Sequence, residues 1–561
     1  MKQLTEIKSQ HENTDTSYSC MMAFFITSAV MVVYLFMSTR TTLWDRDEPR
    51  YARVAVEMVD SGHYLVPTFN DQMWFDKPPL LYWLMSLPVR LLGPTELACR
   101  FFGVVGTALT CLLTFYIGRR LFDSKSALWA MVILASTLLV LVVGSAATSD
   151  AVLLPFIVAV MMIFAYKSVS GTRFYHVILI GIALGLGMLT KGPVGLMPIP
   201  VIGAILWFNR KTTGNILRNI LLVGTSLTIG FLIFAAWAIP VNSFTNGEFF
   251  RVFIGRNVLT RALKPMEHHG GNFLLYLPYY LPVVIVGFFP WTLHLPGALS
   301  AVAGGRVGGK YGRIFLFSWI VPIFIIMTLA ATKLPHYILF IWPALALAVA
   351  GTITAAHQNG LTERDRIWLR RGVWFYGPLA IIIAFGLMIG SWFQQIPGLG
   401  WPGLVSGIVL LMMAVPAIYY QRDNRPQASA KVLIVGMLVF EIPVLFGILP
   451  AIEQVKLSPA IAKAVKSKTN KDTPVVVYNY REPTLNFYIG RHIESLRSEE
   501  EVVAWAKQPD YGVLIIPNDM LNQIQRSYGT LLLDKIASKK GLNYSKGKTL
   551  ELAALIRRMD K

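Results

Sequence analysis

Three carboxylates and two guanidinium groups stand within six residues, Asp45–Arg50, near the start of the chain. Pro49 after an acidic pair is typical of the first turn of a helix. On that helix Asp47, Arg50 and Tyr51 occupy positions i, i+3 and i+4 and therefore share one face. An arginine beside a carboxylate keeps it ionised, so Asp47 is available for acid–base or electrostatic catalysis. The simpler alternative is a salt-bridged helix with a solvated face.

A second charged pair, Asp76 and Lys77, lies about 25 residues further along and precedes Pro78. The apolar stretch Leu80–Leu92 then predicts a helix that is too short to cross a bilayer easily and lies along its outer interface. This places Asp76 and Lys77 at the mouth of a groove with aromatic residues beneath. The Lys77 ammonium is a compact point charge that is suited to a phosphate group.

Three more ionisable residues, Asp150, Lys191 and Lys333, stand where apolar segments end on the same side. An ionisable group at the edge of an apolar segment indicates a functional site, although a single lysine there is more often an interfacial anchor. Together with Lys77 and Arg261, the two lysines are cations that could stabilise the charge developing on a leaving phosphate.

A glycine-rich loop carries the side chains of a candidate metal site, Glu267, His268 and His269. These donors, completed by Asp76, could hold a divalent ion such as zinc or magnesium. Two adjacent histidines do not easily ligate one ion, so a surface histidine pair is the alternative. The chemistry expected of this chain does not require a cofactor.

These residues are embedded in a strongly apolar chain. Its 561 residues are 54% hydrophobic and 15% charged, whereas a soluble domain has about 25% charged residues. Runs long enough to cross about 30 Å of hydrocarbon recur along most of the sequence. They predict thirteen membrane-spanning helices, at approximately 20–39, 100–118, 127–146, 151–167, 175–190, 193–208, 217–240, 277–295, 314–331, 337–356, 375–393, 401–420 and 432–450.

Lysine and arginine are concentrated in alternate loops, as at Arg119–Lys125, Arg306–Arg313 and Arg364–Arg371. The positive-inside rule makes these loops cytoplasmic. With an odd number of spans the N-terminus is also cytoplasmic, and the outer segments are 41–100, 242–276 and the C-terminal tail. The net charge of +20 is therefore mostly topological and does not indicate a nucleic-acid partner.

The C-terminal segment, 451–561, has the pattern of a soluble domain. Thr473–Tyr478 and Gly512–Ile516 resemble strands, and Ser498–Lys507 has a helical pattern. We expect a small α/β domain that serves as a cap or scaffold for the membrane part. The predicted fold class is thus an all-α polytopic membrane protein over residues 1–450 with a C-terminal soluble α/β domain.

The combination of motifs resembles that of the bacterial GT-C glycosyltransferases, and more narrowly that of the aminoarabinose lipid A transferases and related protein-mannosyltransferase-like enzymes. The motifs are Asp47–Ala52, Phe75–Pro79, Thr190–Gly192 and Thr332–Tyr337. The resemblance extends to the number of spans, the outer loops and the soluble tail. One departure is Asp76, where aminoarabinose transferases usually have Glu, and it leaves the identity of the sugar open.

The resemblance implies transfer of 4-amino-4-deoxy-L-arabinose, or a related sugar, from undecaprenyl phosphate to lipid A at the outer face of a bacterial inner membrane. It implies that Asp47 is the main catalytic carboxylate and Asp150 a second acid, and that a metal would map to Asp76 and a loop histidine. The residues implied to bind phosphate or to line the pocket are Lys77, Arg261, Lys333, Arg50, Tyr51, Tyr82 and Tyr337.

Other functions predict different distributions of charge. A transporter would have ionisable groups near the bilayer midplane, whereas here they gather at one rim. A membrane anchor for the soluble tail would not need thirteen spans. Among enzymes, the alternative is a transferase that acts on a protein or another glycan. A hydroxyl acceptor would then need Asp47 as its general base, whereas a phosphate acceptor is already ionised. Either reaction would proceed by one displacement with inversion.

Overall fold

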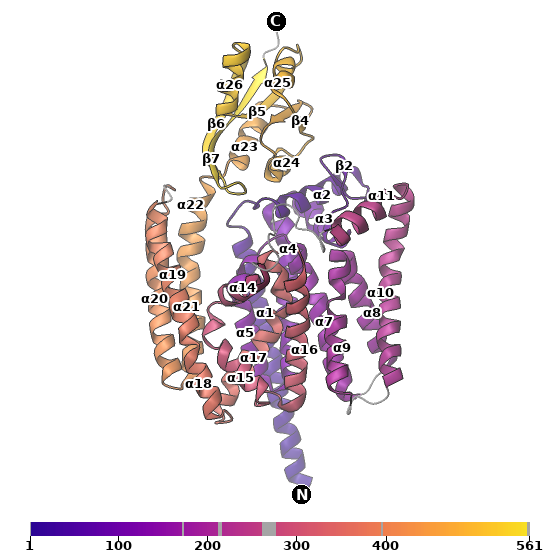
Figure 1. Ribbon diagram of the computed structural model, residues 1–561, viewed down its shortest axis with the longest axis vertical. Helices are drawn as coiled ribbons and strands as arrows, with labels where there is room; N and C mark the ends of the chain where they lie inside the picture. Colours follow the sequence, from indigo (N-terminus) through magenta and orange to yellow (C-terminus); the bar gives the residue numbers. More distant parts are fainter. Residues whose placement is uncertain (1, 171–172, 211–215, 261–275, 394–395, 558–561) are drawn as a thin grey trace.

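The structure of the protein is a computed structural model that describes residues 2–170, 173–210, 216–260, 276–393 and 396–557. A bundle of long helices forms the larger part, and a small domain that contains the strands sits on one end of it (Figure 1). The N-terminus lies beyond the opposite end of the bundle. The predicted combination of a helical membrane part with a C-terminal α/β domain is confirmed.

The elements of the bundle are defined by the following bounds. The α-helices are α1 (Lys2–Ser38), α2 (Asp47–Ser61), α3 (Leu80–Leu92), α4 (Glu96–Leu121), α5 (Ser124–Ala135), α6 (Leu138–Gly144), α7 (Ser149–Ser170), α8 (Phe174–Lys191), α9 (Pro198–Phe208), α10 (Ile216–Phe244), α11 (Glu248–Phe250), α14 (Tyr280–Gly287), α15 (Leu295–Ala303), α16 (Gly309–Leu329), α17 (Trp342–His357), α18 (Glu363–Arg371), α19 (Val373–Phe393), α20 (Gly400–Arg422), α21 (Pro426–Pro443) and α22 (Leu449–Glu453). The 3₁₀ segments are η1 (Gly192–Leu196), η3 (Leu277–Tyr279), η4 (Trp291–Leu293) and η5 (Pro335–Ile341), and the π segments are η2 (Arg251–Thr260) and η6 (Val444–Ile448).

Each of the thirteen predicted spans corresponds to an apolar helical segment. Ten helices of the described residues are long and apolar enough to cross a membrane, and the pair α5 and α6, bent by 67°, makes up to eleven. The other two predicted spans correspond to the shorter helices Pro198–Phe208 and Leu277–Gly287. The chain is therefore a multi-pass membrane protein.

Small residues bring α4 and α7 together beneath the expected outer rim. A Cβ built on Gly103 would lie 2.5 Å from the carbonyl oxygen of Ala146, and one built on Gly106 would lie 2.4 Å from that of Ala151. Only glycine allows this approach, which is a common way for membrane helices to pack. The packing fixes Asp150, at the start of α7, relative to Arg100 in the first turns of α4.

Two short helices, α2 and α3, lie across the end of the bundle that carries the soluble domain (Figure 1). A two-stranded hairpin, β1 (Thr68–Phe69) with β2 (Gln72–Met73), connects them. The hairpin is tied to α2 by Glu57, which accepts hydrogen bonds from Thr68 Oγ1 at 2.8 Å and from the Asn70 backbone N–H at 2.7 Å. Leu80–Leu92 thus forms a short helix at the end of the bundle, as predicted.

The C-terminal domain contains a five-stranded sheet in the order β4-β3-β5-β7-β6. Its elements are α23 (Ser458–Lys468), β3 (Val475–Tyr478), α24 (Pro483–Ile489), β4 (Glu494–Leu496), α25 (Glu499–Ala506), β5 (Val513–Pro517), α26 (Asn518–Tyr528), β6 (Leu533–Asn543) and β7 (Lys548–Arg557). Strands β4, β3 and β5 are parallel, and β7 and β6 add an antiparallel edge. Both predicted strands and the predicted helix are present.

Candidate active site

Glu48 fixes the start of α2 to the bundle. Its carboxylate accepts hydrogen bonds from Arg100 Nε at 2.9 Å, from Arg100 Nη2 at 2.6 Å and from the Ala147 backbone N–H at 2.6 Å. Burial alone would raise the pKa of Glu48, but Arg100 and these hydrogen bonds outweigh burial and hold the pKa below its ordinary value. Glu48 is therefore a structural ion-pair partner that joins α2 to α4.

Asp45 attaches the same segment to the C-terminal domain. Its carboxylate accepts hydrogen bonds from the Thr484 backbone N–H at 2.8 Å, from Thr484 Oγ1 at 2.5 Å and from the Tyr544 hydroxyl at 3.2 Å. Burial is the main reason that the pKa of Asp45 is raised to about 6. The domain thus holds the segment that leads into α2, the predicted catalytic helix, in agreement with a scaffold role.

Asp47 is the member of this acidic trio whose carboxylate stays accessible. Its side chain is 46% exposed, and Arg50 Nη1 lies 3.9 Å away. Arg50 also lies over the Trp74 ring, at 5.8 Å from its centroid. The predicted pairing of Asp47 and Arg50 on one helix face is present, and an accessible carboxylate beside an arginine can stabilise a developing positive charge or orient a ligand.

A cavity of about 430 Å³ opens beside Asp47. It lies between the end of α1, α6 and α21. These helices contribute mostly apolar residues to its lining, and the segment 45–48 contributes charged ones. We call it the acidic cavity; its lining includes Met37, Arg46, Asp47, Leu138, Leu141, Ser145, Met437, Phe440, Glu441 and Leu445. Glu441 comes from the apolar helix α21, and no ion pair to it is present among the described residues.

Asp150 and Lys191 form a buried ion pair between α7 and α8. Lys191 Nζ donates to both carboxylate oxygens of Asp150, at 2.7 and 2.6 Å. His336 Nε2 lies 3.7 Å from the same carboxylate, and the Lys191 ammonium lies 4.6 Å from the centroid of the Tyr337 ring. Three motifs that are distant in the sequence therefore meet here, as the sequence predicted for Asp150, Lys191 and Tyr337.

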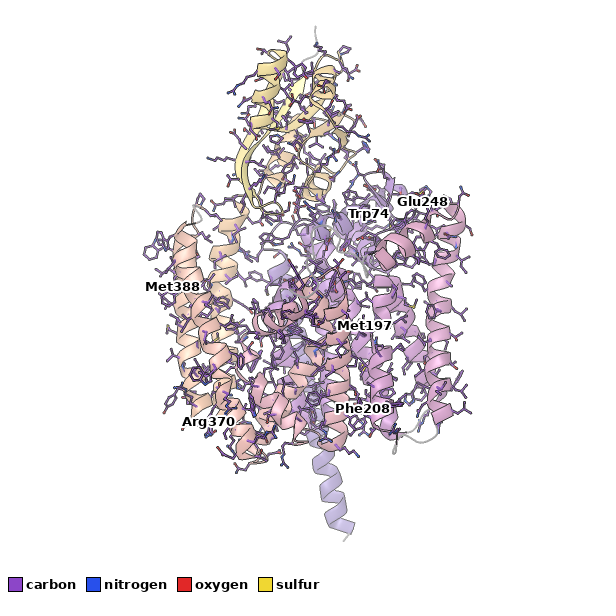
Figure 2. The ribbon with its side chains drawn as sticks, viewed as in Figure 1. Trp74, Met197, Phe208, Glu248, Arg370 and Met388 are labelled. Carbon is purple, nitrogen blue, oxygen red and sulfur yellow. The ribbon has the colours of Figure 1, made fainter. Side chains whose placement is uncertain are left out.

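Lys77 and Lys191 line a second cavity, of about 260 Å³. We call it the basic cavity; its lining includes Asp76, Lys77, Lys191, Val194, Met197, Phe253, Ile326, Met327, Tyr337 and Phe340. Lys77 Nζ donates to Asp76 Oδ2 at 2.8 Å. Met197 lies well below Trp74 in the view of Figure 2, so the cavity extends from the charged rim into the apolar part of the bundle.

Tyr51 of α2 and Tyr82 of α3 pack against each other near the charged residues of the site. Both side chains are buried, with ring centroids 6.1 Å apart, and Lys77 lies 6.0 Å from the centroid of Tyr51. Burial raises the pKa of each phenol, and the charges of Asp47 and Asp76 raise both further. The two tyrosines therefore remain neutral and belong to the packing between α2 and α3. The sequence predicted that they line the pocket, but they line neither cavity because both rings are buried in this packing.

Lys333 is close to the site but lines neither cavity. Its ammonium donates to the carbonyl oxygens of Thr328 and Ala330, and it lies 5.7 Å from the centroid of the Tyr280 ring. It therefore satisfies carbonyls at the C-terminal end of α16. The other predicted cation, Arg261, and the loop histidines His268 and His269 lie outside the described residues.

The metal site stays an expectation. The described part of the chain contains no group of three or more His, Cys, Asp or Glu residues that could hold an ion. Asp76, the one proposed ligand within it, accepts a hydrogen bond from Lys77. The donor set of the described residues is therefore that of an ion pair, and we assign no chemical step to a metal.

Sequence reasoning missed three contributors to the site. His336 belongs to a motif that the sequence had singled out, but its contact with Asp150 depends on the packing of η5 against α7. Arg100 appeared only as the first residue of a predicted span; an arginine there indicates a buried partner. Glu441 is the single acid of the α21 segment, and that isolation was the signal that could have marked it.

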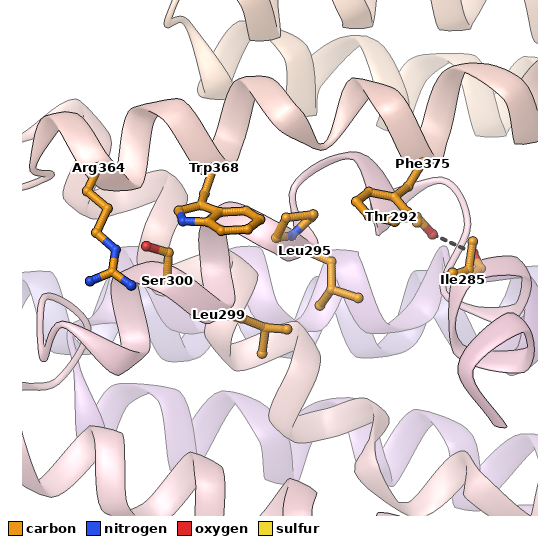
Figure 3. A pocket seen from close by; sticks show the side chains of 9 residues that line it. Ile285, Thr292, Leu295, Leu299, Ser300, Arg364, Trp368 and Phe375 are labelled. Atoms are coloured by element: carbon orange, nitrogen blue, oxygen red, sulfur yellow. Dashed lines mark hydrogen bonds between the residues drawn. The ribbon is translucent and has the colours of Figure 1, made fainter. Parts of the chain in front are cut away.

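A further cavity, of about 410 Å³, lies away from these residues. It is lined by α15, α18 and α19 and by Ile285 and Thr292, whose hydroxyl donates to the Ile285 carbonyl at 2.6 Å (Figure 3). Its one charged lining residue is Arg364, near the start of α18, at the end of the bundle opposite the soluble domain (Figure 1). None of the predicted site residues lines it.

Comparison with known sequences gives matches over most of the chain. The pattern of the dolichyl-phosphate-mannose-protein mannosyltransferase family matches residues 76–239. The undecaprenyl phosphate-alpha-4-amino-4-deoxy-L-arabinose arabinosyl transferase of Pectobacterium atrosepticum is 31% identical over 437 residues, which cover 75% of this chain and 74% of that protein. The enzyme of the same name from Edwardsiella ictaluri is 32% identical over 370 residues, and the match spans 65% of its length.

Comparison with solved structures gives the same fold. The crystal structure of ArnT from Cupriavidus metallidurans bound to undecaprenyl phosphate superposes with a TM-score of 0.77, covering 96% of this chain and 98% of that one at 19% identity. The predicted GT-C resemblance is thus confirmed. The chain belongs to the undecaprenyl phosphate-aminoarabinose arabinosyl transferase family of membrane glycosyltransferases.

Proposed function

We propose that this chain transfers 4-amino-4-deoxy-L-arabinose from undecaprenyl phosphate to a phosphate of lipid A at the outer face of a bacterial inner membrane. The observation that carries the proposal is the basic cavity: two lysines, Lys77 and Lys191, stand at its charged end, and apolar side chains line the part that enters the bundle. A phosphate attached to a long isoprenoid has the matching distribution of charge and apolar surface.

The lysines keep hydrogen-bonding capacity for a ligand. An ammonium group has three N–H donors; Lys77 directs one to the Asp76 carboxylate, and Lys191 directs two to Asp150. Because each lysine is paired with an acid, the two positive charges can be held in a largely buried site before the donor arrives. Their remaining donors would bind the donor phosphate and stabilise it as it leaves.

The transfer would be a single displacement. An oxygen of the acceptor phosphate forms a bond to the anomeric carbon as the bond from that carbon to the undecaprenyl phosphate oxygen breaks, and the configuration inverts. The leaving phosphate takes the electron pair and is stabilised by Lys77 and Lys191. Asp47, whose carboxylate is accessible, would stabilise the positive charge that develops on the sugar. An ionised phosphate acceptor needs no general base.

The acidic cavity supports an amino sugar as the transferred group. Glu441 places a carboxylate in the lining of this cavity, where no cation of the described residues pairs with it. A carboxyl group below the membrane surface is costly to ionise without a cation beside it, and the ammonium group of 4-amino-4-deoxy-L-arabinose would stabilise its charged form. Glu441 and Asp47 line the same cavity, so one sugar bound there would meet both carboxylates.

The proposed orientation places the soluble domain in the periplasm and the N-terminus in the cytoplasm. Arg370, in the basic helix α18, lies at the end of the bundle opposite Trp74 (Figure 2). The positive-inside rule assigns that end to the cytoplasm, and the two cavities with Asp47 and Lys77 then open on the other side.

Reconstituted protein tests the proposal directly. Wild type and Asp47→Asn would be given undecaprenyl-phosphate-linked aminoarabinose with lipid A or with an acceptor peptide, and the glycosylated product would be measured by mass spectrometry. We expect transfer to lipid A by wild type only. No transfer by wild type to any acceptor would contradict an enzymatic role, and transfer to peptide alone would favour a protein acceptor.

A further inference from the structure

The C-terminal domain has a cavity at the carboxyl end of its parallel strands. β3 ends at Tyr478 and β4 ends at Leu496, and the chain crosses from β4 over β3 to reach β5. In open sheets with parallel strands, ligands bind outside the carboxyl ends of the strands.

Three cations line this cavity, which measures about 330 Å³. We call it the anion pocket; its lining residues are Tyr478, Asn479, Arg481, Leu496, Arg497 and Lys546. Arg481 and Arg497 follow the two parallel strands directly, and Lys546 belongs to the turn between β6 and β7. No acid belongs to this lining, so the pocket concentrates positive charge from three separate loops.

The acids of the neighbouring loops and helices make hydrogen bonds. Glu501 accepts one from the backbone N–H of Arg497, at 2.6 Å, so one carboxylate lies directly beside the pocket. Glu499 accepts a hydrogen bond from Gln523 Nε2 at 2.8 Å, and Glu500 accepts one from the Tyr528 hydroxyl at 2.8 Å. Glu482 accepts hydrogen bonds from Asn543 at 3.0 Å and from Ser545 at 2.6 Å. The last three carboxylates are thereby engaged by α26 and by the β6–β7 turn, and none of the four forms an ion pair with the three cations in the described part of the chain.

The anion pocket adjoins the contact between the domain and the acidic cavity. Glu482, next to Arg481 in the sequence, lies 3.6 Å from Arg46 Nε. Arg46 itself lines the acidic cavity with Asp47. Ser545, next to Lys546, is bonded to the same Glu482. A large anionic headgroup bound beside Asp47 would therefore lie next to the anion pocket.

We propose that Arg481, Arg497 and Lys546 bind a second phosphate of the acceptor lipid, distant from the phosphate that receives the sugar. This inference rests on the proposed function, because it assumes a lipid acceptor with two phosphate groups, such as lipid A. Arginine binds phosphate with a planar pair of donors and lysine as a point charge. The soluble domain would then select the acceptor as well as hold α2 in place.

The test compares acceptors with one and two phosphates. The triple variant Arg481→Ala, Arg497→Ala, Lys546→Ala would be reconstituted, and KM and kcat would be measured with bisphosphorylated and monophosphorylated lipid A. We expect KM for the bisphosphorylated acceptor to rise by about tenfold, with kcat unchanged, and KM for the monophosphorylated acceptor to stay at the wild-type value. The matched control, Lys507→Ala, Arg526→Ala, Lys540→Ala, removes three cations from elsewhere on the domain and should change neither.

The outcomes separate this inference from the proposed function. If wild type transfers to neither lipid, the proposed function fails. If wild type transfers but the triple variant keeps the wild-type KM for the bisphosphorylated lipid, or loses affinity equally for both lipids, only the anion pocket assignment is overturned. A loss that depends on added phosphatidylglycerol, and not on the acceptor, would assign the pocket to bulk anionic lipid and would also overturn it.

Discussion

Lys191 Nζ lies 2.7 and 2.6 Å from the two carboxylate oxygens of Asp150. Asp150, the second acid predicted from the sequence, is therefore the counter-ion of Lys191, which is predicted to bind phosphate. The pair is largely buried, with side-chain exposures of 9% and 2%. Asp150 therefore holds the Lys191 ammonium in position at the end of α8, and it lines neither of the two cavities. The resemblance implied a catalytic role for Asp150 beside Asp47; the ion pair instead favours a role in positioning Lys191.

Replacing Asp150 by Asn should destabilise the protein more than it changes the chemistry. The substitution leaves Lys191 buried without its counter-ion, and breaking such a pair costs about 3–5 kcal/mol. Thermal unfolding of the purified protein in detergent measures the loss. Arg370→Ala, which breaks an exposed pair with Glu363, is the control and should change stability little. Equal effects of the two substitutions would contradict a buried pair.

Asp47 and Glu48 are neighbours in the sequence, but we expect substitution of Asp47 to lower activity and substitution of Glu48 to lower stability. Asp47→Asn removes an accessible charge that stabilises the developing positive charge on the sugar, so we expect kcat to fall by about 10²–10³ while the unfolding temperature stays unchanged. Glu48→Gln should lower the unfolding temperature, because Arg100 loses an ionised partner on which two of its nitrogens depend. Activity assays and thermal unfolding of both variants make the comparison, and a stable, active Asp47→Asn protein would exclude Asp47 as the catalytic carboxylate.

Docking of the C-terminal domain should tighten as pH falls. The pKa of Asp45 is about 6 when docked, against an ordinary value of 3.8. Because docking raises this pKa, the docked state binds the proton more tightly; the contribution is complete below about pH 4 and is lost as pH rises through 6. Hydrogen exchange of residues 41–46 at pH 5 and pH 8 measures docking.

Asp45→Asn isolates this group from others at the same interface. His492 Nδ1 lies 2.9 Å from Asp71 Oδ2 across the same interface. That contact is present in both proteins, and the difference between wild type and Asp45→Asn reports Asp45 alone. An identical pH dependence in the two proteins would rule out the raised pKa of Asp45 as the cause.

Glu441→Gln should impair use of an amino sugar specifically. A hydrogen bond to a charged group contributes about 1.5–3 kcal/mol, so we expect KM for the aminoarabinose donor to rise by about tenfold or more. A donor that carries a neutral pentose should be used equally well by both proteins. Kinetics with the two donors provide the measurement, and an equal effect on both would show that Glu441 does not contact the ammonium.

The apolar pattern of the sequence was sufficient to predict the membrane helices and the short helix Leu80–Leu92, because spans and interfacial helices differ in length and flanking charge. It was less informative where a helix is interrupted. The bend between α5 and α6 and the short helix Pro198–Phe208 depend on neighbouring helices that satisfy the backbone. A continuous apolar run does not indicate such a break.

For the site, the sequence by itself determined which residue types gather at one rim, since the motif order and the alternation of basic loops place Asp47, Lys77 and Lys191 on the same side. The tertiary structure decided what each does. Adjacent acids are equivalent in sequence, but Asp45 binds the soluble domain, Glu48 binds Arg100 and Asp47 alone stays accessible. Those roles depend on partners 52 to 439 residues away, and contacts at such separation are set by packing and not by local pattern.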